Sequence, residues 1–86
     1  MKIFYHKRFL KAFHKLPRKI QDKILERVEL SQSAPFQPLL NNHSVESAYP
    51  EWRSINITGD YRALFEVKKE NTIVFMKIGT HSDLYS

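Results

Sequence analysis

The side chains best suited to chemistry lie in the second half of the chain. His43 and His81 can each carry a proton near neutral pH, because the unperturbed pKa of histidine is about 6.5. Asp60 can act as a base, and Arg62 stays positively charged and can bind two phosphate oxygens at once. Tyr85 offers an aromatic surface for an unpaired nucleobase. Together these residue types fit the cleavage of a phosphodiester without a metal ion.

Cleavage of RNA by its own 2′-OH sets three chemical requirements. One group must take the 2′ proton, another must protonate the departing 5′ oxygen, and a fixed cation must stabilise the charge on the phosphate. The residues above meet all three, with Lys77 as a second cation and Trp52 as a second aromatic surface. A plainer interpretation fits as well, in which Arg62 pairs with a nearby carboxylate and His81 is a solvated tail residue.

The composition disfavours other classes of site. The chain has no cysteine, and no two of its four histidines have a metal-ligand spacing on one predicted element, so we expect no metal site. Gly59 and Gly79 are the only glycines, too few for a glycine-rich phosphate loop. No serine lies in a nucleophile elbow. We therefore expect a chain that uses no cofactor.

Three predicted strands would position these residues. Runs rich in β-branched and aromatic residues predict strands over residues 52–57, 61–68 and 72–78. Tight hairpin turns would join them, and we expect Gly59 to take a positive φ in the first turn. The chain then leaves the last strand at Gly79 into a tail that carries His81 and Tyr85. Such a sheet would bring the tail close to Arg62.

The N-terminal half is predicted to be mainly helical. A short strand over 2–6 would join the sheet at an edge or beside its last strand. Apolar residues then recur at helical spacing over 7–16 and 17–30, and Pro17 separates the two helices. His6 is a weak N-cap for the first of them. This order predicts one α+β domain over residues 1–86, a two-helix hairpin packed on an antiparallel three-stranded meander.

A long connection precedes the meander. It begins near Ser31, carries His43, and is expected to hold Leu39 and Leu40 against the core. Long loops in small domains are often functional. The connection is therefore a place where a site residue is expected.

Positive charge is concentrated at the N-terminus. Residues 1–27 carry nine Lys or Arg and two Asp or Glu, a net charge of +7, whereas residues 28–86 have a net charge of −2. This asymmetry favours a polyanionic partner, with Lys11 and Lys15 as candidate phosphate contacts, although a solvated lysine-rich surface would look the same. No apolar run approaches the roughly 20 residues that span a bilayer, and no signal peptide is present, so we expect a cytoplasmic protein.

Two segments resemble a known family. The run from Asn56 to Phe65, NITGDYRALF, followed by GTHSDLY from Gly79 to Tyr85, resembles the RelE/ParE superfamily of bacterial toxins. The ending is most similar to the YafQ-like mRNA interferases, and the resemblance covers essentially the whole chain. It implies a small cytoplasmic toxin of a type II toxin–antitoxin module that enters the ribosomal A site and cuts mRNA. Its partners would be mRNA, the ribosome and a cognate antitoxin.

The resemblance also implies roles for single residues. Arg62 matches the strand arginine that binds the scissile phosphate in RelE-type members. The other matches are a tail histidine, a turn carboxylate, a loop histidine and a terminal aromatic residue, which are His81, Asp60, His43 and Tyr85. One position departs from the pattern, because YafQ-like proteins often have a histidine where this chain has Asn56. Asparagine cannot carry a proton, so proton transfer would fall to the remaining groups.

Two other functions stay open on the sequence. ParE-type relatives poison DNA gyrase and lack the tail histidine, which makes His81 the discriminating residue. A catalytically inert RNA-binding or plasmid-maintenance module is the second alternative. Both would keep the fold and the basic N-terminus.

The basic N-terminus gives a first prediction. Replacing Lys7, Lys11 and Lys15 by Gln should weaken ribosome association and lower the slope of log affinity against log salt by about 2 to 3, if each contacts one phosphate. Cosedimentation with ribosomes across salt concentrations measures this slope, with Lys69→Gln as the control. Identical slopes for the triple variant and the wild type would remove the phosphate-binding role.

Overall fold

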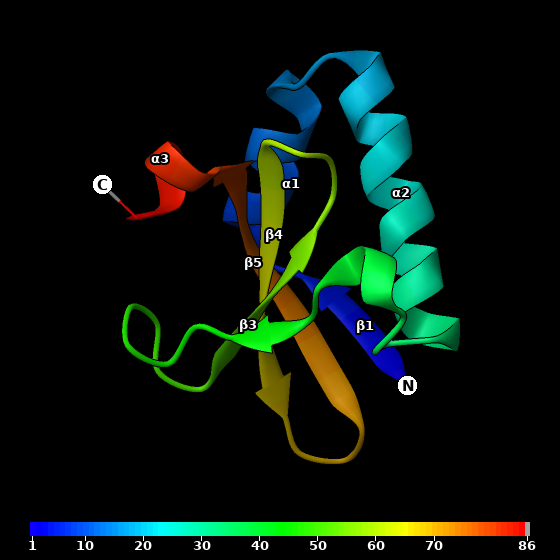
Figure 1. Ribbon diagram of the computed structural model, residues 1–86, viewed down its shortest axis with the longest axis vertical. Helices are drawn as coiled ribbons and strands as arrows, with labels where there is room; N and C mark the ends of the chain where they lie inside the picture. Colours follow the sequence, from blue (N-terminus) through cyan, green and yellow to red (C-terminus); the bar gives the residue numbers. More distant parts are fainter. Residues whose placement is uncertain (86) are drawn as a thin grey trace.

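The computed structural model describes residues 1–85, which form a five-stranded sheet with helices against it (Figure 1). The elements in chain order are β1 (Lys2–Tyr5), α1 (Lys7–Lys15), α2 (Arg18–Ser33), the 3₁₀ helix η1 (Pro38–Leu40), β2 (His43–Ser44), β3 (Trp52–Asn56), β4 (Tyr61–Lys68), β5 (Thr72–Thr80) and α3 (His81–Tyr85). The strand order is β1-β5-β4-β3-β2. Only β1 and β5 pair in parallel. The predicted α+β class and the order strand, two helices, meander are confirmed.

Three elements were not predicted, namely η1, β2 and α3, and η1 lies within the predicted connection. The two-residue strand β2 pairs with β3 and adds a fifth strand to the sheet. The C-terminal tail is not extended, because β5 continues to Thr80, where it pairs with Tyr61, and the chain then turns directly into α3. In Figure 1, α3 lies at one side of the sheet and α2 runs along the other.

Local boundaries differ from the predictions for identifiable reasons. Helix α2 continues to Ser33 because two serines satisfy their hydroxyls inside the helix, Ser31 donating to Val28 O at 2.6 Å and Ser33 to Leu30 O at 3.3 Å. His6 is a working N-cap, since its Nδ1 accepts from Arg8 N–H at 3.0 Å. The expectation of an uncapped α1 is therefore wrong.

The turn chemistry also differs from the prediction. No glycine has a positive φ within residues 1–85. The turn after β3 is closed by the Thr58 hydroxyl, which accepts from Asp60 N–H at 3.2 Å and Tyr61 N–H at 3.0 Å. The β4–β5 hairpin instead uses two consecutive left-handed residues, Glu70 with φ 60° and Asn71 with φ 57°, as the twist of a tight hairpin requires.

Apolar side chains pack on both faces of the sheet. The main core lies between the sheet and the two long helices and contains Phe9, Ile24, Val28, Leu40, Ile55, Ile57, Ala63, Phe65, Ile73 and Phe75. A smaller cluster on the opposite face contains Val45, Leu64 and Leu84, with Tyr49, Trp52 and Tyr85 against it. Residues of one strand alternate between the faces, so the even-numbered positions of β3 point away from the long helices.

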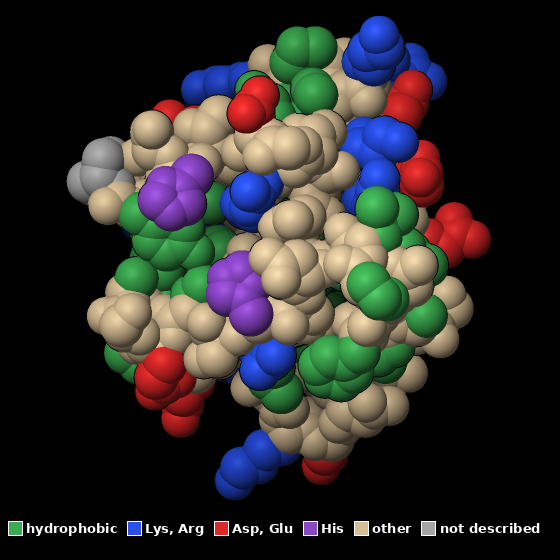
Figure 2. All heavy atoms as spheres, in the orientation of Figure 1, with side chains coloured by type: hydrophobic (Ala, Val, Ile, Leu, Met, Phe, Trp, Pro, Cys, Tyr) green, Lys and Arg blue, Asp and Glu red, His purple; other side chains and the backbone are tan. Residues whose placement is uncertain are grey.

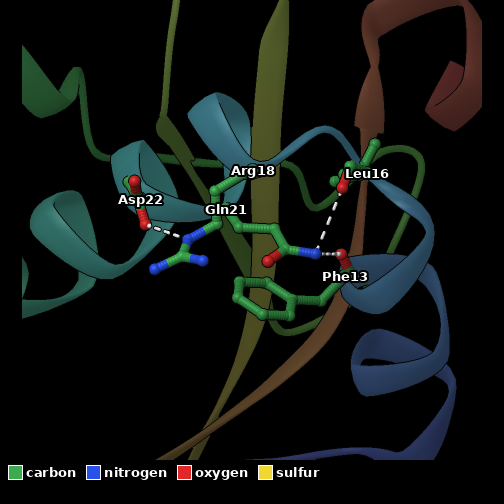
Figure 3. A network of polar contacts seen from close by, with 5 residues as sticks. All are labelled: Phe13, Leu16, Arg18, Gln21 and Asp22. Carbon is green, nitrogen blue, oxygen red and sulfur yellow. Dashed lines mark hydrogen bonds and ion pairs between the residues drawn. The ribbon is translucent and has the colours of Figure 1, made fainter.

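One glutamine joins the two helices of the hairpin. Gln21 Nε2 donates to Phe13 O at 3.0 Å and to Leu16 O at 3.1 Å (Figure 3). Phe13 lies in the last turn of α1 and Leu16 is its C-cap, and the Phe13 carbonyl also accepts from Leu16 N–H at 3.1 Å. Gln21 thus supplies a donor to carbonyls at the end of α1, where the helix itself leaves carbonyls unpaired. The Arg18–Asp22 ion pair beside it, also drawn in Figure 3, is solvent-exposed and contributes little to stability.

The connection after α2 is anchored by one leucine. Leu40 is fully buried, as predicted, whereas Leu39 is 54% exposed and does not pack into the core as predicted. Within the part of the chain that the structure describes, no helix has the length and apolar character needed to cross a membrane.

The packing of α2 generates a stability prediction. Ile24 is 1% exposed within the main core, so Ile24→Ala should lower the free energy of unfolding by about 2 to 5 kcal/mol. Leu25, the next residue, is 54% exposed, and Leu25→Ala should change it by less than about 0.5 kcal/mol. Denaturant titrations of the two variants measure this difference, and equal losses would show that α2 is not packed through Ile24.

Candidate active site

A shallow pocket of about 270 Å³ lies beside the smaller cluster, on the face of the sheet away from α2. Its lining residues are His43, Ser44, Val45, Ser47, Ala48, Ser54, Arg62, His81 and Tyr85. Four of the five side chains singled out for chemistry therefore meet here, from β2, β4 and α3. Figure 2 shows two histidine side chains on one face of the molecule, with a Lys or Arg side chain close to them.

The guanidinium of Arg62 is held from one end. Its Nη1 donates to three carbonyls, those of Thr58 and Gly59 at 3.0 Å and of Tyr61 at 3.1 Å. The ion pairs formed within residues 1–85 involve other residues, so Arg62 is not neutralised by a carboxylate there. The plainer interpretation of Arg62 as half of a structural ion pair is wrong. A positioned, uncompensated cation at a pocket wall is suited to a phosphate.

The protonation of the His43 ring follows from its backbone partner. The Nδ1 of His43 lies 2.7 Å from Asn41 O, and a carbonyl can only accept, so Nδ1 carries the proton. Asn41 has a left-handed φ of 45° at the end of η1, which turns this carbonyl toward the ring. In the neutral ring Nε2 is then unprotonated. His43 is therefore arranged to take a proton at Nε2.

His81 is placed by the start of α3. Thr80 N–H donates to Asp83 Oδ2 at 3.0 Å, and Asp83 N–H donates to Thr80 Oγ1 at 3.2 Å, a reciprocal capping box. Gly79 makes room for this turn, because a Cβ at its position would lie 3.0 Å from the Asp83 Cβ. His81 is the first residue of α3, and its ring is tilted by 41° against the Tyr85 ring one turn later, with 4.7 Å between ring centroids.

Tyr85 closes the pocket from the end of α3. Partial burial is the largest influence on its hydroxyl and raises the pKa of Tyr85, while the neighbouring Ser54 hydroxyl and the Arg62 charge oppose the shift. Ser54 is 1% exposed, and its Oγ has no hydrogen-bond partner of good geometry within residues 1–85. The Ser54 hydroxyl therefore does not offset the effect of burial, and the pKa of Tyr85 is raised. The phenol is therefore neutral at physiological pH.

Sequence reasoning missed Ser54 and the Thr80–Asp83 box. In the sequence, Ser54 has no feature that distinguishes it from other strand residues. It lines the pocket because β3 pairs with β2 on one side and with β4 on the other, which places Ser54 between His43 and Leu64. The box was recognisable, because threonine followed three residues later by an acidic residue is the signature of a helix start.

The other candidate residues lie outside this pocket. Asp60 lines an adjoining depression that also contains His81. Trp52 stacks on Tyr49 with 4.8 Å between centroids, and the Lys77 ammonium lies 5.2 Å from the same Tyr49 ring. Lys11 and Lys15 are exposed on α1. Within residues 1–85 no three His, Asp or Glu side chains are placed to hold a metal ion together.

Comparison with known proteins places the chain in a family. Residues 3–85 match the model of the ParE toxin of the type II toxin–antitoxin system parDE. The chain belongs to this family of toxins, within the RelE/ParE superfamily. A comparison with curated protein sequences found no match.

Solved toxin structures share the fold. YafQ from E. coli BL21(DE3) has a TM-score of 0.80 at 20% identity, covering 99% of this chain and 98% of YafQ. The YoeB/ParE toxin from Agrobacterium tumefaciens has 0.78 at 15% identity, covering 94% and 99%. The RelB–RelE antitoxin–toxin complex from Methanococcus jannaschii has 0.74 at 23% identity, covering 95% and 94%. At these identities the similarity shows the common fold of the toxins.

The capping box gives a prediction on pH. The Thr80 N–H, and less strongly its hydroxyl, hold the pKa of Asp83 below its ordinary value of 3.8. The box therefore stabilises α3 fully at pH values above the ordinary pKa of Asp83. This stabilisation is lost as the pH falls through the lower pKa that Asp83 has in the folded protein. Thr80→Ala should raise the pKa of Asp83 part of the way back, because the backbone donor remains. An NMR titration of the Asp83 carboxyl measures this.

The control for this titration is Thr72→Ala, at the other end of β5, which should leave the Asp83 titration unchanged. An Asp83 pKa at its ordinary value in the wild type, or no change in Thr80→Ala, would show that the box does not form in solution.

Proposed function

We propose that this toxin is an endoribonuclease that inhibits translation by cutting mRNA on the ribosome, without a metal ion. The observation that supports this proposal is the pocket lined by two histidines and an arginine, and within residues 1–85 no carboxylate pairs with that arginine. Acid, base and phosphate-binding cation are the three groups that transesterification by a 2′-OH requires.

The geometry suggests a division of roles. His43, whose Nδ1–H donates to Asn41 O, takes the 2′ proton at Nε2. The 2′ oxygen attacks phosphorus, the bond to the 5′ oxygen breaks, and His81 protonates that leaving oxygen. Arg62 stabilises the charge that collects on the phosphate oxygens. The products are a 2′,3′-cyclic phosphate and a 5′-OH end.

An in-line displacement needs its acid and its base on opposite sides of the phosphate. His43 and His81 come from β2 and α3 and line the same pocket as Arg62, so each can serve a different oxygen of a phosphate bound there. Tyr85, neutral and close to His81, provides a ring on which the base of the reacting nucleotide can stack. Asp60 lies in the adjoining depression, so we assign both proton transfers to the histidines.

The helical hairpin would bind the ribosome. Lys7, Lys11 and Lys15 are exposed on α1 and can contact rRNA phosphates in any sequence context. A toxin that cuts mRNA on ribosomes would act in the cytoplasm. A cognate antitoxin is the second proposed partner, since a structural neighbour is an antitoxin–toxin complex. The basic hairpin, uncompensated over residues 1–27, is the surface that suits an acidic antitoxin segment.

A gyrase poison is the second candidate function. It is favoured by the name of the matching family model, which is that of ParE. Such a toxin needs no proton carrier in α3, so it makes no use of His81 or of the tautomer of His43. Substitution at His81 therefore separates the two functions.

The nuclease proposal predicts a large and specific effect of His81. His81→Ala should lower the single-turnover rate of mRNA cleavage on ribosomes by roughly two to four orders of magnitude, the usual size of a lost general acid or base. His81→Gln keeps hydrogen-bonding capacity but carries no proton, so a similar loss would indicate proton transfer. Quenched-flow kinetics with translating ribosomes measures these rates.

His14→Ala, an exposed histidine on α1, is the matched control and should cleave at the wild-type rate. Both His81 variants should unfold within a fraction of a kcal/mol of the wild type, because the side chain is exposed. Growth arrest and cleavage that persist in His81→Ala would reject the nuclease and leave gyrase as the target to be assayed.

A further inference from the structure

A tyrosine outside the pocket lining contacts the helix that carries two of the pocket residues. Tyr49 lies in the loop between β2 and β3, and its hydroxyl donates to the Leu84 carbonyl at 2.5 Å. Leu84 lies in α3 between His81 and Tyr85, both of which line the pocket. This hydrogen bond thus joins residues that are 35 positions apart in the chain.

Helix α3 is too short to be stable on its own. It has five residues, whereas isolated helices shorter than about 12 residues are marginal in water. Its start is fixed by the Thr80–Asp83 box. At the other end, the last carbonyls of a helix have no partner within the helix, and Tyr49 supplies a donor to one of them. The end of α3 is therefore held by a group from another part of the chain.

The side chain of Leu84 adds a contact of a different kind. It is 6% exposed and packs with Val45 and Leu64 in the smaller cluster. Apolar burial holds α3 on the sheet but has no directional preference, whereas a hydrogen bond weakens steeply away from linearity. The Tyr49 contact can therefore fix how α3 is turned about its buried leucine, and with it where the two pocket side chains of α3 point.

The ring of Tyr49 is itself held on several sides. It stacks on Trp52 with 4.8 Å between ring centroids and 5° between the ring planes. It meets the Tyr85 ring edge-on with 6.1 Å between centroids. Lys77 Nζ lies 5.2 Å from the Tyr49 centroid and donates to its hydroxyl at 3.4 Å. Because the ring is already oriented, its hydroxyl binds α3 with little further loss of side-chain entropy.

The loop that carries Tyr49 also forms part of the pocket wall. Its backbone is closed by hydrogen bonds from Tyr49 N–H to Val45 O at 2.8 Å and from Trp52 N–H to Tyr49 O at 3.1 Å. Three residues of this loop line the pocket, namely Val45, Ser47 and Ala48. The phenol therefore ties the wall beside β2 to the wall that α3 forms.

We propose that Tyr49 is a positioning residue, whose hydroxyl fixes α3 so that His81 and Tyr85 keep their places in the pocket. In this role it contacts no substrate atom and acts through the Leu84 carbonyl. This inference rests on the proposed endoribonuclease function.

The test compares single-turnover cleavage of mRNA by the wild type and by Tyr49→Phe, which lacks the hydroxyl but keeps the ring. Tyr49→Phe should lower the rate at saturating ribosomes roughly 10-fold, because a misplacement of about 1 Å can cost up to about 100-fold. The ribosome concentration that gives half of the maximal rate should not change, since the basic hairpin is intact. Tyr49→Ala also removes the ring beside Tyr85 and should lose about 100-fold.

A second measurement follows the position of α3 without any reaction. The His81 ring lies 4.7 Å from the Tyr85 ring, whose ring current shifts the His81 proton signals in an NMR spectrum. In Tyr49→Phe these signals should move toward those of histidine in an unstructured peptide. Rates and spectra are measured well below the unfolding temperature of each variant, so that a lower global stability alone alters neither.

Tyr5→Phe is the matched control, because it removes the same atom from a tyrosine on β1 and should keep the wild-type rate and His81 signals. A wild-type rate or unchanged His81 signals in Tyr49→Phe would overturn the positioning role and leave the endoribonuclease standing. So would a higher half-saturating ribosome concentration at an unchanged maximal rate, since Tyr49 would then serve binding. No cleavage by the wild type on translating ribosomes would overturn the endoribonuclease itself.

Discussion

Side chains of β3 and β4 alternate between the apolar core and the pocket, and the pairing of these two strands places Ser54 and Arg62 on the pocket face. Ile55 pairs with Ala63 on the core face, while Asn56 pairs with Arg62 on the pocket face. A slip of one residue would bury the arginine under α2 and expose the isoleucine. The hydrophobic effect on one face therefore holds the charged group in position on the other.

Around this frame, short-range backbone contacts aim the reactive groups. The left-handed Asn41 turns its carbonyl to the His43 ring, the Thr80–Asp83 box starts α3 at His81, and the Arg62 guanidinium is fixed by the carbonyls of its own turn. Each contact lies within a few residues of the side chain that it orients. Local contacts thus orient each side chain, and the sheet brings these side chains to one end of the molecule. Because the side chains are already oriented, less side-chain entropy is lost when a ligand binds.

The molecule carries most of its positive charge and its candidate reactive groups on different surfaces. Most of its positive charge lies on the helical hairpin, where phosphate contacts carry no sequence information. The pocket face holds Arg62 together with His43 and His81. On the proposed function, the basic hairpin would bind a large polyanion and the pocket would carry the chemistry.

The sequence by itself determined the order and class of the elements, because apolar periodicity and β-branched runs depend only on local spacing. It also named His43, Arg62, His81 and Tyr85, which the structure brings to one pocket. Tertiary structure decided the rest. The strand β2 and the burial of the Ser54 hydroxyl depend on pairings between distant residues. No local pattern encodes these pairings, since they arise only when the strands share one sheet.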